Sequence, residues 1–336
     1  MKKKLALIHT ATINANYVSI DSVTYGANSP IIYFNSGALT ANEEAIDAET
    51  SGDGSSITIT NSGMVNAGID GISAATGAYA EGHNSDIIIM NTGAITAGEV
   101  GIYASTGQNY TSDNSKISIT NSGTIVAGLI ALENGHGIYA HTDGEGSSIT
   151  IDNTASITGG ADFNGIYAIT EGDVVGVNVG ISITNTGGTI SGGPGESGVR
   201  ITNTGEIEGM VAGISIANTG TISGGPGASP IEIVNEGSIA ADSGLAIEVT
   251  GAAGASIENA GLVTGFVNLS GGEDAFNNSA GATFLALGTS DFGVSDDAIN
   301  NEGTVRTVED GDVAEITVSG PLLKQYQANL PAFVAT

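Results

Sequence analysis

Apolar and polar residues alternate in a short phrase that recurs along most of the chain. In "KISITNSGTIVAG" (116–128), a polar residue separates Ile117 from Ile119, and Asn121 follows two positions later. Alternation with a period of two predicts a strand with one buried face, and Asn121 shares the parity of the two isoleucines. We therefore predict a short strand whose isoleucines and final asparagine all point inward.

The rest of each phrase predicts two further short strands. A glycine two positions after the asparagine, such as Gly123, permits the positive φ of a sharp turn. A second strand with one inward apolar residue follows, as at Ile125, and a third reads "GISAAT", "GIYAST", "GIYAHT" or "GIYAIT" in successive copies. Three strands joined by sharp corners describe one coil of a parallel β-helix. Such a coil buries its isoleucines only by stacking on a copy of itself.

The recurring asparagine is the main candidate for a structural site. Its spacing varies from 15 to 32 residues, which suits coils with loops of variable length better than a helical hairpin repeat of fixed period. Because the asparagines share the parity of the isoleucines, we predict an inward ladder hydrogen-bonded from coil to coil. The alternative is an exposed turn residue chosen for its tolerance of left-handed backbone. The predicted ladder comprises Asn61, Asn91, Asn121, Asn153, Asn185, Asn203, Asn218 and Asn235.

The predicted fold class is all-β, a right-handed single-stranded parallel β-helix, or solenoid, with one coil for each recurring asparagine. The handedness follows because crossovers between parallel strands are almost always right-handed. The predicted parts are an irregular N-terminal cap at 1–30, a parallel β-helix at 31–319 and a C-terminal linker at 320–336. The β-helix is divided into long coils at 31–190, lean coils at 191–265 and degenerate coils at 266–319. In the degenerate coils, Asp274 and Asp297 replace an inward apolar residue.

Composition narrows the classes of function. Seven Lys and Arg residues against 36 Asp and Glu residues give a formal net charge of −29. Such a surface repels phosphate backbones and anionic lipid, so we expect no nucleic-acid partner. The absence of cysteine excludes disulfides, thiol catalysis and thiolate metal sites. With 40% apolar residues, the chain is expected to fold despite its charge.

The N-terminal segment resembles only part of an export signal. "MKKKLALIHTATINANY" has a basic start, but its apolar run, Leu5–Ile8, is shorter than the roughly 7–15 residues of a signal peptide core. Three interpretations stay open: a start further upstream, the absence of an export signal, or a lysine-rich start without function. No apolar run is long enough to predict a membrane-spanning helix.

The repeats and the C-terminal motifs together resemble the passenger region of bacterial autotransporters, the proteins of type V secretion. The resemblance rests on units such as "NTGTISGG" and "NSGTIVAG", on "GTSDFGVSDDAINNEGTV" (288–305) and on "YQANLPAFVA" (326–335). It implies a pectin-lyase-like β-helix displayed outside the cell, at the bacterial surface and outer membrane. It also implies an outer-membrane β-barrel translocator, which these residues do not supply, so we expect a truncation at the passenger–barrel junction.

Candidate catalytic residues do not form a known constellation. "NGHGIYAH" (134–141) contains a Gly-His-Gly motif like that of polygalacturonases, but His136 lies in a slot that varies between copies. The Asp pair upstream and the Arg-Ile-Lys motif of that family are missing. "ADSGLAIE" (241–248) is a poor match to a serine-protease loop, and "SGGEDAFNN" (270–278) is a single, wrongly spaced likeness of a calcium repeat. We predict no catalytic residue, no metal site and no cofactor, although weak calcium binding by acidic loops stays open.

Two surfaces are candidates for binding. Tyr103, Tyr139 and Tyr167 each follow an inward isoleucine, which predicts an exposed aromatic row that either stabilises the sheet or contacts a carbohydrate or protein. Variable loops are expected at 77–86, 107–116, 141–148 and 171–180. We predict a surface-displayed adhesin or structural spacer without enzymatic activity, whose partner is a host or bacterial surface protein or glycan. The alternative is a β-helical polysaccharide lyase or hydrolase of an autotransporter or a phage tailspike.

Overall fold

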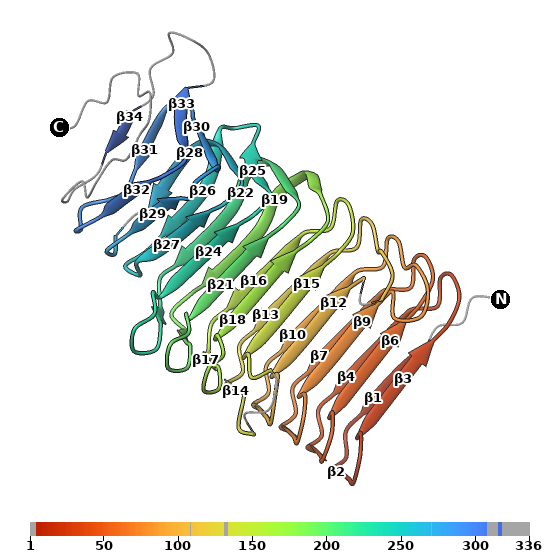
Figure 1. Ribbon diagram of the computed structural model, residues 1–336. Helices are drawn as coiled ribbons and strands as arrows, with labels where there is room; N and C mark the ends of the chain where they lie inside the picture. The colour runs from red at the N-terminus through yellow and green to blue at the C-terminus, as the bar shows by residue number, and fades with distance from the viewer. Residues whose placement is uncertain (1–4, 108, 131–133, 270, 308–314, 318–336) are drawn as a thin grey trace.

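The computed structural model confirms an all-β parallel β-solenoid (Figure 1). It describes residues 5–107, 109–130, 134–269, 271–307 and 315–317. Every element in these ranges is a strand, and about eight turns carry all three sheets. The described residues contain no helix that could span a membrane. The right-handed sense of the coil stays a prediction.

Three parallel sheets form the walls of the solenoid, and we name them sheets A, B and C. Sheet A contains β1 (Leu5–His9), β4 (Ile31–Asn35), β7 (Ile57–Asn61), β10 (Ile87–Asn91), β13 (Ile117–Asn121), β16 (Ile149–Asn153), β19 (Val174–Asn185), β22 (Glu206–Asn218), β25 (Ser238–Ala241), β26 (Leu245–Thr250), β28 (Leu262–Leu269), β30 (Thr283–Ala286), β31 (Thr289–Asp291), β33 (Thr304–Thr307) and β34 (Glu315–Thr317). Sheet B contains β2 (Ile13–Ala15), β5 (Leu39–Ala41), β8 (Val65–Ala67), β11 (Ile95–Ala97), β14 (Ile125–Val126), β17 (Ser156–Thr158), β20 (Thr189–Ser191) and β23 (Thr221–Ser223). Sheet C contains β3 (Ile20–Thr24), β6 (Ile46–Thr50), β9 (Ile72–Thr76), β12 (Ile102–Thr106), β15 (Ile138–Thr142), β18 (Ile166–Thr170), β21 (Val199–Asn203), β24 (Ile231–Asn235), β27 (Ala255–Asn259), β29 (Ala275–Asn278) and β32 (Ala298–Asn301).

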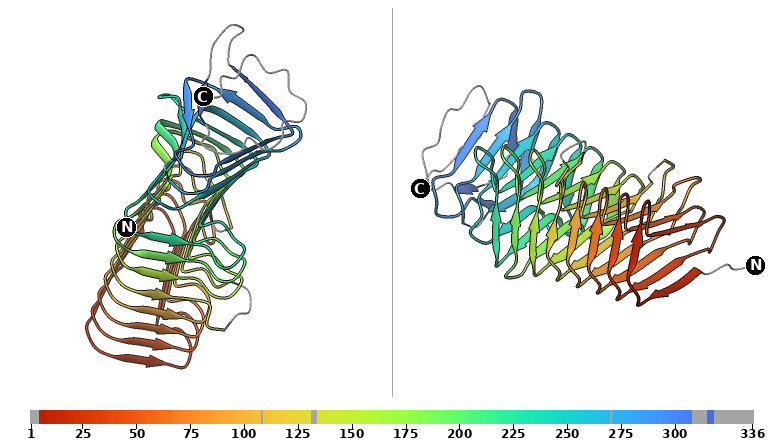
Figure 2. Two further views of the ribbon diagram at one scale, coloured as in Figure 1. Left: turned by 90° about the vertical axis from the view of Figure 1, so that its left-hand side faces the viewer. Right: turned by 90° about the horizontal axis from the view of Figure 1, so that it is seen from below.

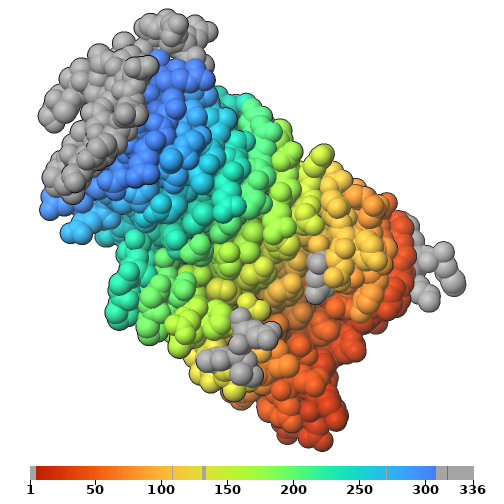
Figure 3. All heavy atoms as spheres, viewed as in Figure 1, coloured from red at the N-terminus to blue at the C-terminus, as the bar shows by residue number. Residues whose placement is uncertain are grey.

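Each coil sits in register on its predecessor, which explains why the phrase recurs. Ile119 pairs with Ile89 on one side and Ile151 on the other, and all three are fully buried. Figure 2 shows the coils stacked as successive layers, and in Figure 3 each part of the chain occupies its own band along the rod. The isoleucine columns therefore merge into one continuous core along the axis.

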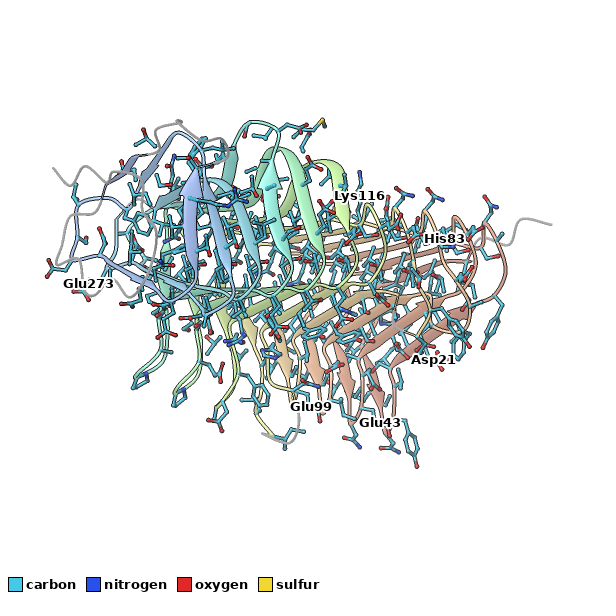
Figure 4. All side chains as sticks on the ribbon, turned by 45° about the horizontal axis from the view of Figure 1, so that its top comes forward. Asp21, Glu43, His83, Glu99, Lys116 and Glu273 are labelled. Carbon is cyan, nitrogen blue, oxygen red and sulfur yellow. The ribbon has the colours of Figure 1, made fainter. Side chains whose placement is uncertain are left out.

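Three corners connect the sheets of each coil that carries all three. In the coil that begins at β10, the first corner (92–94) joins sheet A to sheet B, the second (98–101) joins B to C, and the third (107–116) leads to the next coil. Figure 4 places His83 and Lys116, at the third corner, along one edge of the rod and Glu43 and Glu99, at the second corner, along the opposite edge. The two rows of corner loops thus flank the outer face of sheet C.

The first coil corrects the prediction of an irregular cap at 1–30. Strands β1, β2 and β3 all lie in this range, and each pairs with the matching strand of the next coil. The asparagine that marks later coils is His9 in this one, in register with Asn35, so the repeat was not recognisable from that residue. The predicted linker at 320–336 lies outside the described residues.

The lean coils predicted at 191–265 are also corrected. The strands of sheet C end in asparagine from Asn203 onward, while those of sheet A do so until Asn218, so between Asn185 and Asn235 the motif occurs twice per coil and its spacing falls by about half. Asn185 and Asn218 are 33 residues apart and occupy equivalent positions, so this coil is as long as those before it. Coils become shorter only after β23, the last strand of sheet B.

Candidate functional site

The predicted asparagines lie inside the solenoid, but in two columns rather than one. At the end of the sheet A strands, each Asn Nδ2 donates to the Oδ1 of the asparagine in the next coil. The donor–acceptor distances are 2.7 Å for Asn61 to Asn91, 2.8 Å for Asn91 to Asn121 and 2.9 Å for Asn121 to Asn153. The same Nδ2 of Asn121 donates to the carbonyl of Gly123 at 2.8 Å. The column continues through Asn185 to Asn218, so the exposed-turn alternative is wrong for these residues.

Asn203 and Asn235 belong to a second column at the end of the sheet C strands. Thr170 Oγ1 donates to Asn203 Oδ1 at 3.0 Å, and Asn203 Nδ2 donates to Asn235 Oδ1 at 2.9 Å. The column then runs through Asn259 and Asn278 to Asn301. A single ladder of eight asparagines is therefore wrong: stacking pairs residues one full coil apart, and between Asn185 and Asn235 consecutive copies of the motif belong to different sheets.

A buried serine column escaped the sequence analysis. The Ser55 N–H donates to Ser85 Oγ at 2.9 Å, the Ser85 N–H to Ser115 Oγ at 2.9 Å, and the Ser115 N–H to Ser147 Oγ at 3.0 Å. All four side chains are essentially inaccessible to solvent. Each serine stands two positions before the first isoleucine of its strand and therefore shares its inward parity. This spacing is the feature of the sequence from which the buried column could have been predicted.

We expect the asparagine columns to stabilise the stacking of coils. Replacing Asn121 by Ala should lower the free energy of unfolding by about 1–3 kcal/mol, because the buried amides of Asn91 and Asn153 each lose a hydrogen-bond partner. Urea denaturation followed by circular dichroism measures the effect. Thr120→Ala is the matched control, since Thr120 is exposed on the same strand. Equal losses for both variants would contradict a stabilising role for the column.

His136, the histidine of the Gly-His-Gly motif, serves as a buried acceptor at the second corner. Its side chain is 7% exposed, and its Nδ1 accepts the backbone N–H of Asn164 at 3.1 Å. Burial lowers the pKa of His136 to about 4, and the positive charge of Arg200 acts in the same direction. At neutral pH His136 is therefore uncharged and holds two successive coils together.

The predicted tyrosine row does lie on the outer face of sheet C. Tyr103 and Tyr139 are stacked with parallel rings 5.3 Å apart, and Tyr167 meets Tyr139 edge to face at 5.7 Å. His136 packs against Tyr167 at 5.0 Å and against Phe163 at 5.3 Å. The second-corner loops thus add two rings to the row, which no spacing in the sequence predicted.

Polar groups border this row on its C-terminal side. Arg200 lies 5.9 Å from the centre of the Tyr167 ring and donates to Glu232 Oε2 at 2.6 Å. Asn164 Nδ2 donates to Glu196 Oε2 at 3.0 Å. We define the aromatic patch as Tyr103, His136, Tyr139, Phe163, Tyr167 and Arg200. Apart from the buried His136, its side chains are all half-buried and so reach solvent with part of their surface.

Acidic side chains border the row on its N-terminal side. Burial raises the pKa of Asp47 to about 6, and the nearby charges of Glu49, Glu44 and Asp21 add to the effect. Burial likewise raises the pKa of Asp70 to about 7, although its Oδ1 accepts the Val100 N–H at 2.9 Å. Across the described residues, no group of three or more His, Asp or Glu side chains is placed to hold a metal ion.

The four predicted loops have different outcomes. Segments 77–86 and 107–116 do form third-corner loops, and His83 Nδ1 lies 3.2 Å from Asp113 Oδ2 between them. Segment 141–148 begins within β15. Segment 171–180 is not a loop over most of its length, because alternating β-branched residues place it in β19 from Val174 onward.

The other two motifs are structural in this fold. Asp242–Gly244 is a turn between β25 and β26, closed by the Gly244 N–H to the carbonyl of Ala241 at 2.8 Å. In the calcium-like stretch, Asp274 is 3% exposed and faces the interior.

Searches against protein-family models, curated proteins and solved structures found no match to this chain.

Proposed function

We propose that this chain is a non-enzymatic binding rod, a surface-displayed passenger of the autotransporter kind that acts as an adhesin. The observation that carries the proposal is the aromatic patch. It gathers half-exposed rings and an arginine on one rigid wall of the solenoid. The resemblance of the repeats and of the motif at 288–305 to autotransporter passengers supports the location outside the cell.

The chemistry of the patch suits recognition. Tyrosine combines a large apolar ring with a polar edge, and Tyr, Trp and Arg are the residues that contribute most to binding at interfaces. Arg200 and Glu232 present a charged pair beside the rings, with both side chains partly open to solvent. Because stacked coils fix the backbone beneath them, these side chains lose little freedom when a partner binds.

The same geometry argues against general acid–base catalysis at His136. A catalytic base needs a pKa near the working pH and a free nitrogen within reach of substrate. His136 has a pKa of about 4, and its Nδ1 is engaged by Asn164. Arg200, the one basic side chain of the patch, is already paired with Glu232.

The function is tested by displaying the chain on cells that do not otherwise adhere, and measuring both autoaggregation and attachment to host cell layers. Tyr139→Ala should reduce adhesion at least about tenfold, because it removes the ring that contacts Tyr103, His136 and Tyr167. Tyr17→Ala is the control, since Tyr17 is 71% exposed at the second corner of the first coil. Circular dichroism must show that both variants stay folded.

Further outcomes of this experiment separate the alternatives. Tyr110→Ala removes an exposed ring from the third-corner loop at 107–116, and loss of adhesion in this variant alone would move the binding surface to those loops. Absence of adhesion in the wild-type chain itself would favour a structural spacer, and adhesion that survives all three substitutions would place the binding surface elsewhere on the rod. Release of reducing ends or unsaturated sugars from a polysaccharide by the purified chain, lost in His136→Ala, would replace the proposal with an enzyme.

A further inference from the structure

Two carboxyl groups are stacked inside the last coils of the solenoid. Asp274 and Asp297 immediately precede β29 and β32, and the register of these strands places Asp274 beside the buried Ala255. Earlier coils carry Ile231, Val199 or Ile166 at this inward position. Asp274 is 3% exposed and Asp297 is 1% exposed, so the interior holds two ionisable groups where the repeat elsewhere places apolar ones.

Each carboxyl group accepts a backbone N–H from the coil before it. The Ala255 N–H donates to Asp274 Oδ1 at 2.7 Å, and the Asp274 N–H donates to Asp297 Oδ1 at 3.1 Å. The other oxygen of Asp274, Oδ2, is buried and meets no hydrogen-bond donor within the described ranges. A buried carboxylate with an unsatisfied oxygen is costly unless a cation or a proton compensates its charge.

Among the described residues, no positively charged side chain forms an ion pair with Asp274. Glu258 lies on the outer face of β27, Arg306 is exposed on β33, and Glu273 and Asp296, which precede Asp274 and Asp297 in the chain, are also exposed. Asp297 is the titratable group that acts on Asp274, and it carries the same sign of charge. A proton on the carboxyl group would remove the buried negative charge that the neighbouring Asp297 disfavours.

We propose that Asp274 and Asp297 form a proton-binding switch that makes the order of the last coils depend on pH. The protonated pair sits in the core as a neutral group, and loss of the proton leaves a buried negative charge beside a second carboxyl group. The segment that responds is the run of sheet C from β27 through β29 to β32, because its backbone amides are the donors to the pair.

The direction of the effect follows from the pKa of Asp274. Burial raises this pKa to about 7, the charge of Asp297 raises it further, and the Ala255 hydrogen bond opposes the shift. In the unfolded chain the pKa returns to about 3.9. The folded state therefore binds more protons between these values, so the contribution of Asp274 to stability is complete below about pH 4 and is lost as the pH rises to about 7.

Amide hydrogen exchange on the full chain, corrected for the intrinsic rate, tests the switch. Between pH 5 and pH 8 we expect exchange in β27 and β29 to accelerate by more than about tenfold in the wild-type chain. Asp274→Asn keeps an oxygen acceptor for Ala255 but cannot ionise, so the acceleration should disappear. Asp296→Asn, the exposed neighbour, should retain it.

Two results would overturn the proposal. One is protection of β27 and β29 that is equal at both pH values in the wild-type chain. The other is an acceleration that persists in Asp274→Asn. If Asp274→Asn fails to fold, carbon-detected NMR of the wild-type side chain decides: titration of the Asp274 carboxyl carbon near pH 7 supports the switch, and titration near pH 4 excludes it.

Discussion

Replacing Gly123 by Ala should destabilise the protein by more than about 3 kcal/mol, because the first corner leaves no room for a side chain. A Cβ built on Gly123 would lie 1.9 Å from the carbonyl oxygen of Gly93 in the preceding coil, and one on Gly93 would lie 1.9 Å from that of Gly63. These neighbours are backbone atoms held by the Asn column, so they cannot move aside as a flexible side chain would. The loss is measured as a shift in the urea midpoint.

The control for this prediction is Ser122→Ala, at the exposed neighbour of Gly123. It removes only a surface hydroxyl and should change stability by less than about 0.5 kcal/mol. A Gly123→Ala variant as stable as this control would show that the coils are not as closely spaced at this corner as the structure has them.

Truncating one isoleucine of the core should have the second-largest effect. Ile119→Ala is expected to cost about 2–5 kcal/mol, because Ile89 and Ile151 are fixed in register above and below the gap and cannot collapse into it. Thermal and urea denaturation of the purified chain measure the loss. Ser118→Ala changes the outward neighbour on the same strand and should be nearly neutral. Comparable losses in the two variants would contradict the assignment of faces.

The sequence predicted which side chains face inward and which face outward, because this depends only on their parity within one strand. Ile57, Ile59 and Asn61 were expected to face inward, and all three are fully buried. The parallel stacking of coils followed from the repetition itself, and the outward position of Tyr103 and Tyr139 followed from the same alternation. Such predictions succeed because side chains on a strand alternate between its two faces whatever its neighbours are.

The spacing of residues along the sequence did not predict which of them lie next to one another in adjacent coils. Asn203 follows Asn185 in the series of motifs, yet it stacks on Thr170 and Asn235 because they are one coil away. The hydrogen bond between Asn164 and His136 joins two second-corner loops, and the two residues are 28 positions apart in the sequence. The loops differ so much in length that a fixed repeat period could not have aligned these residues. The aromatic patch therefore required the folded backbone.

The direction of the backbone hydrogen bonds has a mechanical consequence. Strands run around each coil, so the bonds between parallel strands lie along the axis of the rod. A force that pulls the ends of the rod apart loads these bonds in series, and the outermost coil should peel away while the others remain folded. A tethered rod of this kind would yield gradually under tension, lengthening by one coil of chain at each step instead of rupturing as a single unit.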